Sequence, residues 1–192
     1  WTTPITFVAS ANCALYCGAK IDFVDINPKT GLICTNALEE KLKKARKVNS
    51  LPKIVIPVHL SGTSCDMKKI HDLSIKYGFK IIEDASHAIG GKYKNIPVGS
   101  CKYSEITVFS FHPVKIITTG EGGIISTNNK KVAKLIRNLR SHGITKDKND
   151  FKYEPKGSWV YEQQYLGYNY RMNDIQAALG LSQLKRLEII VE

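Results

Sequence analysis

The sequence predicts an α/β protein whose sheet is mostly parallel and covered by helices on both faces. Apolar segments of strand length alternate along the chain with amphipathic segments of helix length, and the strand segments are almost uninterrupted in their apolar character. Such strands are typical of sheets buried on both faces. At 192 residues, the chain is long enough for one sizeable domain with a buried core.

Five helices are predicted from apolar periodicity. We expect Thr35 to be the N-cap of one helix and Asp66 to be the N-cap of the next, which Gly78 ends. The predicted helices run over residues 7–17, 35–45, 66–77, 129–141 and 173 to the end of the chain.

Five strands are predicted over residues 21–26, 53–58, 79–84, 106–111 and 122–127. The last two are too close in sequence to have a helix between them, so we expect part of the sheet to be antiparallel. Residues 143–167 lack clear periodicity and are predicted to form a long surface loop.

Charge composition restricts the classes of partner. Lys and Arg number 28 against 17 Asp and Glu, which gives a formal net charge of +11. The basic residues are spread along helical segments such as EEKLKKARKV, so we interpret most of them as a solvated helix surface and expect no nucleic-acid partner. A phosphate-bearing small substrate is compatible with this charge.

Cysteine usage and hydropathy indicate the compartment. The five cysteines include no CxxC pair, and Cys13 and Cys17 are spaced for one helix face, which predicts reduced, buried thiols. No signal peptide is visible, and no apolar run approaches the ~20 residues needed to cross a bilayer. We therefore expect a cytoplasmic protein without a membrane partner.

Polar side chains follow three predicted strands at their carboxyl ends, where ligands bind in open α/β sheets. Asp84 and His87 follow one strand, Ser110 and Lys115 follow another, and His59 follows a third. An acid, an amine and hydroxyls at neighbouring strand ends are what a pyridoxal 5'-phosphate (PLP) site needs. The amine bonds to the cofactor aldehyde, and the carboxylate keeps the pyridine nitrogen protonated.

Each of these signals is weak alone. Asp84 could simply cap a turn, and the GEGG segment at Gly120–Gly123 could be only a turn into the next strand. The histidines are not spaced as metal ligands, so no metal site is predicted. The sequence has no GxGxxG, GxxxxGK[ST] or GxSxG segment, which leaves dinucleotide, P-loop and hydrolase interpretations without support.

Six ordered segments together closely resemble the nucleotide-sugar aminotransferases of the DegT/DnrJ type: TPITFVASAN, PVHLSG, EDASHAIG, FSFHPVKIITTGEGG, RSHG and GYNYRMNDIQAALGLSQL. The resemblance spans nearly the whole chain. It implies PLP as cofactor and the aspartate-aminotransferase-like fold (fold type I), a three-layer α/β/α domain with a mixed, mostly parallel sheet. It also implies that residues 1–192 are a large PLP-binding domain, with a phosphate loop upstream of Trp1 and a smaller domain after Glu192.

The resemblance carries residue roles with it. Lys115, in the S-F-H-x-x-K pattern, matches the lysine that bonds to the cofactor and shuttles the proton once the substrate amine has freed it. Asp84 matches the carboxylate that pairs with the pyridine nitrogen. His87 falls where most members carry Gln, near the 3-hydroxyl of the cofactor.

Three further matches concern the ring face and the phosphate. Phe7 matches the aromatic residue that stacks on the pyridine, and Ser110 matches a phosphate-binding hydroxyl. Asn169, in GYNYRM, matches an asparagine donated across the dimer interface to the partner's cofactor phosphate. The resemblance thus implies a homodimer with a shared active site.

Within the family, DASHAIG, HPVK and TTPITFVAS look most like members of the pseudaminic acid pathway. Those members transfer an amino group from glutamate to the 4-keto carbon of a UDP-linked 2-acetamido-2,6-dideoxy sugar. The sugar dehydratases of the family replace the lysine with histidine, so Lys115 favours transamination. The alternatives are another PLP-dependent nucleotide-sugar aminotransferase or dehydratase, a non-catalytic regulatory or binding protein of the same fold, and, on charge alone, a nucleic-acid binder.

Overall fold

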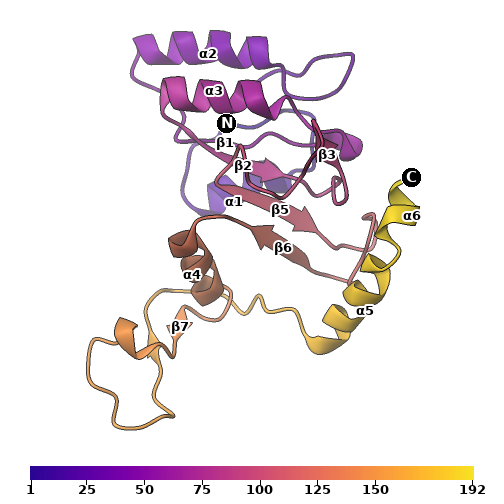
Figure 1. Cartoon of the computed structure of the whole chain (residues 1–192). Helices are drawn as coiled ribbons and strands as arrows, with labels where there is room; N and C mark the ends of the chain where they lie inside the picture. The colour runs from indigo at the N-terminus through magenta and orange to yellow at the C-terminus, as the bar shows by residue number, and fades with distance from the viewer.

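A four-stranded mixed sheet forms the centre of the computed structural model, which describes residues 1–192 (Figure 1). The strand order is β1 (Ile54–Val55), β2 (Lys80–Asp84), β5 (Ile106–Ser110) and β6 (Gly123–Ser126). The first three strands are parallel and β6 runs antiparallel to β5, which confirms the predicted mixed sheet.

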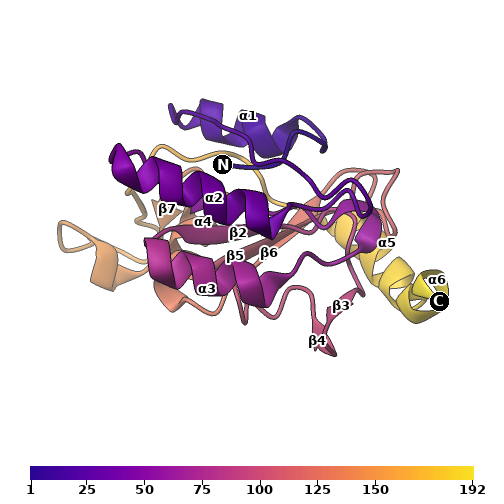
Figure 2. The same cartoon turned by 90° about the horizontal axis from the view of Figure 1, so that it is seen from above.

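Helices lie on both sides of this sheet. Figure 2 shows α1 (Ala9–Tyr16) on one side and α3 (Met67–Tyr77) on the other, with α2 (Thr35–Lys47) beside α3. The main core fills the space between α2, α3 and the first two strands, and its centre includes the fully buried Leu42 and Ile70. Burial of these side chains is the main stabilising term for this half of the chain.

The remaining helices follow the sheet along its other edge. α4 (Lys130–Leu139) comes directly after β6, and α5 (Asp174–Leu184) and α6 (Leu187–Val191) lie beside the far ends of β5 and β6 (Figure 1). These three helices contain no buried residue. None of the helices in the chain combines the length and apolar character needed to span a membrane.

Two hairpins lie outside the main sheet. β3 (Lys92–Tyr93) pairs with β4 (Ile96–Pro97) through a turn in which both Lys94 and Asn95 have positive φ. The sequence gives no Asn-Gly or Asp-Gly signal there, which is why the turn was not predicted. β7 (Ile144–Thr145) pairs with β8 (Glu162–Gln163) inside the segment predicted to form a long surface loop.

Helix boundaries with strong local signals are confirmed. The Asp66 side chain accepts from the Lys69 N–H at 3.4 Å, and Gly78 ends α3 with φ of 78°. The expected role of Thr35 is wrong by one residue, because Cys34 is the N-cap and Thr35 is already helical. The last predicted helix is divided between α5 and α6 at Lys185 and Arg186.

Two other predictions are wrong. The segment 21–26 forms no strand and makes only isolated bridges, Phe23 with Thr2 and Ile26 with Ile33. Cys13 and Cys17 are exposed, because α1 turns only Ser10 and Ala11 into the interior. All five cysteines are free thiols.

Candidate active site

The carboxyl ends of β2 and β5 lie side by side. In their parallel register Asp84 stands opposite Val108, so Asp84 and Ser110 end neighbouring strands at one edge of the sheet. The turns that follow carry His87 and Lys115. Both predicted site segments therefore begin at the same edge of the sheet, where ligands bind in open α/β sheets.

Asp84 is firmly held in both its backbone and its side chain. Its N–H donates to the Pro57 carbonyl and its carbonyl accepts from the His59 N–H, each at 3.0 Å. Its Oδ2 accepts from the Ser10 hydroxyl of α1 at 2.5 Å, and its Oδ1 accepts from the Ser86 N–H at 3.1 Å. Two donors fix the direction of this half-buried carboxylate.

His87 links Asp84 and Lys115 electrostatically. Burial and the positive charge of Lys115 lower the pKa of His87 from its ordinary 6.5, and the negative charge of Asp84 works in the opposite direction. The His87 imidazole is therefore neutral at neutral pH. Its Nδ1 accepts from the Ser61 N–H at 3.3 Å, which leaves the proton on Nε2.

Lys115 belongs to the turn that leaves β5. Its N–H donates to the His112 carbonyl at 2.9 Å, and its side chain is half-buried. None of the ion pairs in the chain involves its Nζ atom. The Lys115 amine is thus free of ion pairs, and its charge and that of Asp84 both act on His87.

Phe7 and Ser110 are two further predicted site residues, one before α1 and one at the end of β5. Phe7 comes just before α1, its carbonyl accepts from the Ser10 N–H at 3.3 Å, and its ring is 71% exposed. The Ser110 Oγ accepts from the His112 N–H at 3.4 Å. The chain thus presents an open aromatic face beside α1 and a hydroxyl at the end of β5.

Asn169 does not join these residues. It is exposed and forms a bridge with Ser141, just beyond α4. Its neighbours Tyr168 and Tyr170 stack with ring centroids 4.8 Å apart. Within one chain, the site that the sequence predicts is therefore divided into a strand-end group and a separate Asn169 segment.

Sequence reasoning missed Ser10 and Ser61. Ser10 contacts Asp84 only because α1 packs on that side of β2, and Ser61 contacts His87 through its backbone in a turn where Ser61 has φ of 52°. No sequence signal marks either contact.

The side chains at the strand ends nevertheless fit PLP, since they offer an acid, an amine, a hydroxyl and an open aromatic face. The chain contains no group of three or more His, Cys, Asp or Glu side chains placed to hold a metal ion.

Comparison with known proteins identifies the family. Residues 1–192 match the profile of the DegT/DnrJ/EryC1/StrS aminotransferase family. The chain belongs to this family. Among curated DegT/DnrJ relatives, it is 43% identical over 189 residues to the UDP-4-amino-4,6-dideoxy-N-acetyl-beta-L-altrosamine transaminase of Campylobacter jejuni, covering 97% of this chain and 46% of the relative. It is 41% identical over 187 residues to the spore coat polysaccharide biosynthesis protein SpsC of Bacillus subtilis, covering 97% and 46%.

Solved DegT/DnrJ structures agree with the fold. Helicobacter pylori PseC, described as an aminotransferase involved in the biosynthesis of pseudoaminic acid, superposes with a TM-score of 0.84 at 36% identity, covering 98% of this chain and 46% of that one. A family member from Brucella abortus gives 0.85 at 32% identity, covering 98% and 47%. The predicted PLP-transferase fold is confirmed. The chain spans about half the length of the curated relatives it matches.

Proposed function

We propose that this chain is the large, cofactor-binding part of a PLP-dependent sugar aminotransferase. The reaction moves an amino group from glutamate to the 4-keto carbon of a UDP-linked 2-acetamido-2,6-dideoxy sugar, for pseudaminic acid or a related surface glycan. The observation that carries this proposal is the unpaired, half-buried Lys115 beside His87 and the fixed Asp84. Relatives named as transaminases of such a sugar support the substrate class.

Each residue of the group has a separate task. PLP, when bound, supplies an electron sink for the carbon that gains or loses the amino group. Lys115 would hold the cofactor through Nζ and, as a free amine, would hold at Nζ the proton that is moved. The Asp84 carboxylate would accept a hydrogen bond from the pyridine N–H of the cofactor, and the Ser10 hydroxyl and the Ser86 N–H fix the direction of this carboxylate. The neutral His87 would donate its Nε2–H to the 3-oxygen of the cofactor.

The remaining assignments concern the ring face, the phosphate and assembly. Phe7 would stack on the pyridine, and Ser110 would donate to the phosphate. Asn169 would reach the phosphate of a second protomer, which makes the proposed enzyme a homodimer with shared sites. The exposure of Asn169 and its separation from Asp84 and Lys115 support this arrangement. Five free thiols favour a reducing compartment, so we propose a cytoplasmic enzyme.

The test uses the full-length protein with PLP. We expect a visible absorption band that disappears in Lys115→Ala, because the band depends on the bond to Nζ. Lys102→Ala is a matched control that should leave the band unchanged. A Lys115→Ala protein with the wild-type spectrum would refute the cofactor assignment.

Mass spectrometry of products then defines the reaction. The full-length enzyme is incubated with glutamate and a panel of UDP-linked 4-keto sugars. An amino sugar supports transamination, a dehydrated sugar indicates the dehydratase alternative, and the absence of turnover over the whole panel favours the non-catalytic alternative.

A further inference from the structure

A second pair of polar residues lies buried below the candidate site. His59 is 0% exposed and Glu83 is 5% exposed, and their Nε2 and Oε2 atoms are 2.7 Å apart. Glu83 precedes Asp84 on β2. Because side chains alternate along a strand, Glu83 faces the core side with Ile81, and Asp84 faces α1. The proposed function gives this buried pair no role.

The hydrogen bonds define the protonation state of the pair. The Cys65 N–H donates to His59 Nδ1 at 3.2 Å, so Nδ1 carries no proton and Nε2–H donates to Glu83. The hydroxyls of Ser104 and Thr107 donate to the other carboxylate oxygen, Thr107 at 3.0 Å. The imidazole is therefore neutral, and a buried carboxylate is stabilised by three donors without a cation.

Two chains of contacts lead from the pair to the site. Glu83 is bonded directly to Asp84, and the His59 backbone N–H donates to the Asp84 carbonyl at 3.0 Å. The bond from Cys65 to His59 closes the loop 59–65. That loop carries Ser61, whose N–H donates to His87. One buried imidazole thus connects to both Asp84 and His87.

Stability alone does not explain a carboxylate in this position. Ile81, two residues earlier on the same face of β2, is packed in the apolar core at 1% exposure. Replacing a buried polar pair by well-packed apolar residues is often neutral or stabilising. A hydrogen-bonded pair, in contrast with an apolar one, fixes the direction and register of the segments it joins.

We propose that His59 and Glu83 are positioning residues that hold Asp84 and His87 in place for the cofactor. The Nε2 side of His59 fixes the end of β2 and therefore Asp84. The Nδ1 side fixes the loop 59–65 and therefore His87. The consequence for the cofactor rests on the proposed function, whereas the coupling to His87 does not.

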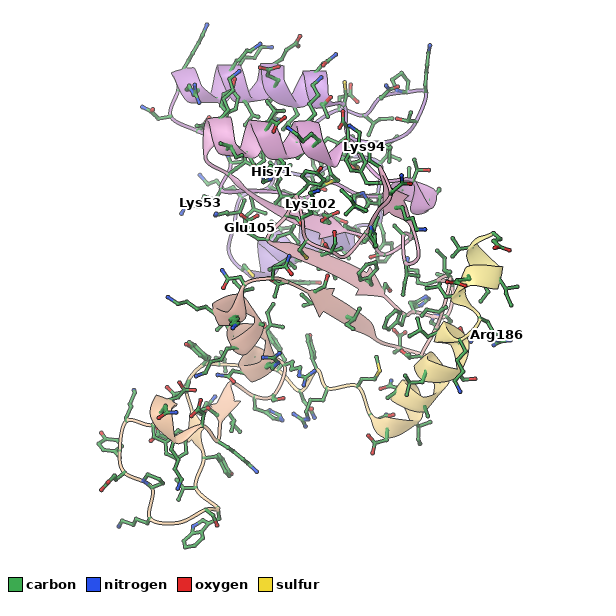
Figure 3. All side chains as sticks on the ribbon, viewed as in Figure 1. Lys53, His71, Lys94, Lys102, Glu105 and Arg186 are labelled. Atoms are coloured by element: carbon green, nitrogen blue, oxygen red, sulfur yellow. The ribbon has the colours of Figure 1, made fainter.

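Two substitutions separate the two sides of the imidazole. His59→Gln keeps an amide donor near the position of Nε2 and loses the acceptor for Cys65. His59→Asn keeps an acceptor near the position of Nδ1 and loses the donor to Glu83. Ser104→Ala, which removes another donor to Glu83, is a milder second variant if His59→Asn does not fold. His71→Gln, on α3 (Figure 3), is the matched control for loss of a histidine.

The first measurement follows the His87 imidazole by NMR in the cofactor-free, full-length protein. Lys115, Asp84 and the Ser61 N–H are the groups that act on it. We expect the pKa of His87 to rise in His59→Gln, because a displaced Ser61 N–H no longer stabilises the neutral ring. We expect it to stay at the wild-type value in His59→Asn and His71→Gln.

The second measurement follows PLP affinity and the pH titration of its visible band. His59→Asn and Ser104→Ala should weaken affinity about threefold to tenfold, the range for one lost hydrogen bond, and displace the titration of the band. His59→Gln should change this titration less than His59→Asn does.

The positioning role is supported if His59→Gln changes mainly the pKa of His87 and His59→Asn changes mainly the affinity for PLP and the titration of its band. If both His59 variants lower thermal stability alike and leave the His87 titration and the band titration unchanged, the pair is only part of the packing and the proposal is overturned. A wild-type protein that lacks the visible band overturns the proposed function instead, and the cofactor-free His87 titration then decides the positioning role by itself.

Discussion

The two faces of β2 at its carboxyl end carry neighbouring carboxylates with different surroundings. Glu83 is buried at 5% exposure, and donors of its own chain reach both of its oxygens: His59, Ser104 and Thr107. Asp84 is half-buried and receives donors from Ser10 and Ser86, and its charge acts on His87 together with that of Lys115.

This comparison separates a structural acid from a ligand-facing acid. Both are fixed in place, so rigidity does not distinguish them. The difference is that the chain supplies every donor to Glu83, whereas the surroundings of Asp84 remain accessible to a ligand. Adjacent positions on one strand can therefore hold the strand end from the core side and meet a ligand from the other side, because their side chains point to opposite faces of the sheet.

The largest effect should come from Asp84→Asn. The variant keeps the shape of the side chain and an oxygen that accepts from the Ser86 N–H, and its amide NH2 can donate to the Ser10 hydroxyl, but it loses the charge that stabilises a protonated pyridine. We expect kcat/KM to fall about 10²- to 10³-fold, the range for loss of one preorganised electrostatic contact. The free energy of unfolding should change little. Steady-state kinetics and urea denaturation measure the two quantities, and a fully active variant would contradict the assignment of Asp84.

Glu83→Gln should lose more stability than Asp84→Asn and less activity, because Glu83 acts on the site only through Asp84. Glutamine cannot accept from His59 on one side while its other atom accepts from Ser104 and Thr107, so a buried donor is left without an acceptor. We expect a loss of about 1–3 kcal/mol in the free energy of unfolding. Asp72→Asn, in the exposed pair with Lys68, is the control and should cost less than about 1 kcal/mol.

The same variant predicts a pH dependence. Burial works to raise the pKa of Glu83, but the hydrogen bonds from His59, Ser104 and Thr107 outweigh it and hold the pKa below the ordinary 4.5. The stabilisation is therefore present above pH 4.5 and is lost as the pH falls through the lower, folded value. Wild type should lose stability over this acid range more steeply than Glu83→Gln does. Equal slopes would show that Glu83 is not held ionised in the fold.

Signals close together in sequence made part of this structure predictable. Asp66 and Gly78 define α3, and apolar runs define β2 and β5. Parallel strands end at one edge of a sheet, so the pairing of β2 with β5 brings Asp84 and the segment that leads to Lys115 to the same edge.

Other features depend on packing that no local pattern encodes. The exposure of Cys13 and Cys17 depends on which face of α1 meets the sheet, and the segment ASANCALY has no strongly apolar face to indicate it. The His59–Glu83 pair joins residues 24 apart in sequence. The family resemblance gave roles to Asp84 and His87, but it did not indicate which residues hold them in place.

The smallest effect on the site should come from Ser10→Ala, which tests how far the orientation of the Asp84 carboxylate depends on α1. The Ser10 hydroxyl donates to Asp84 Oδ2 at 2.5 Å, so its removal leaves the carboxylate with the Ser86 N–H as its remaining donor from the chain. Loss of one hydrogen bond is expected to weaken PLP affinity about twofold to tenfold.

Ser86→Ala is a matched control, because Ser86 contacts Asp84 through its backbone N–H and alanine retains that donor. Fluorescence titration with PLP should therefore separate two substitutions that each remove one serine hydroxyl close to Asp84. If Ser10→Ala and Ser86→Ala bind PLP equally well, the hydroxyl of α1 does not aim Asp84. The orientation of the carboxylate would then depend on the end of β2 alone, which the backbone hydrogen bonds of Asp84 to Pro57 and His59 hold in place.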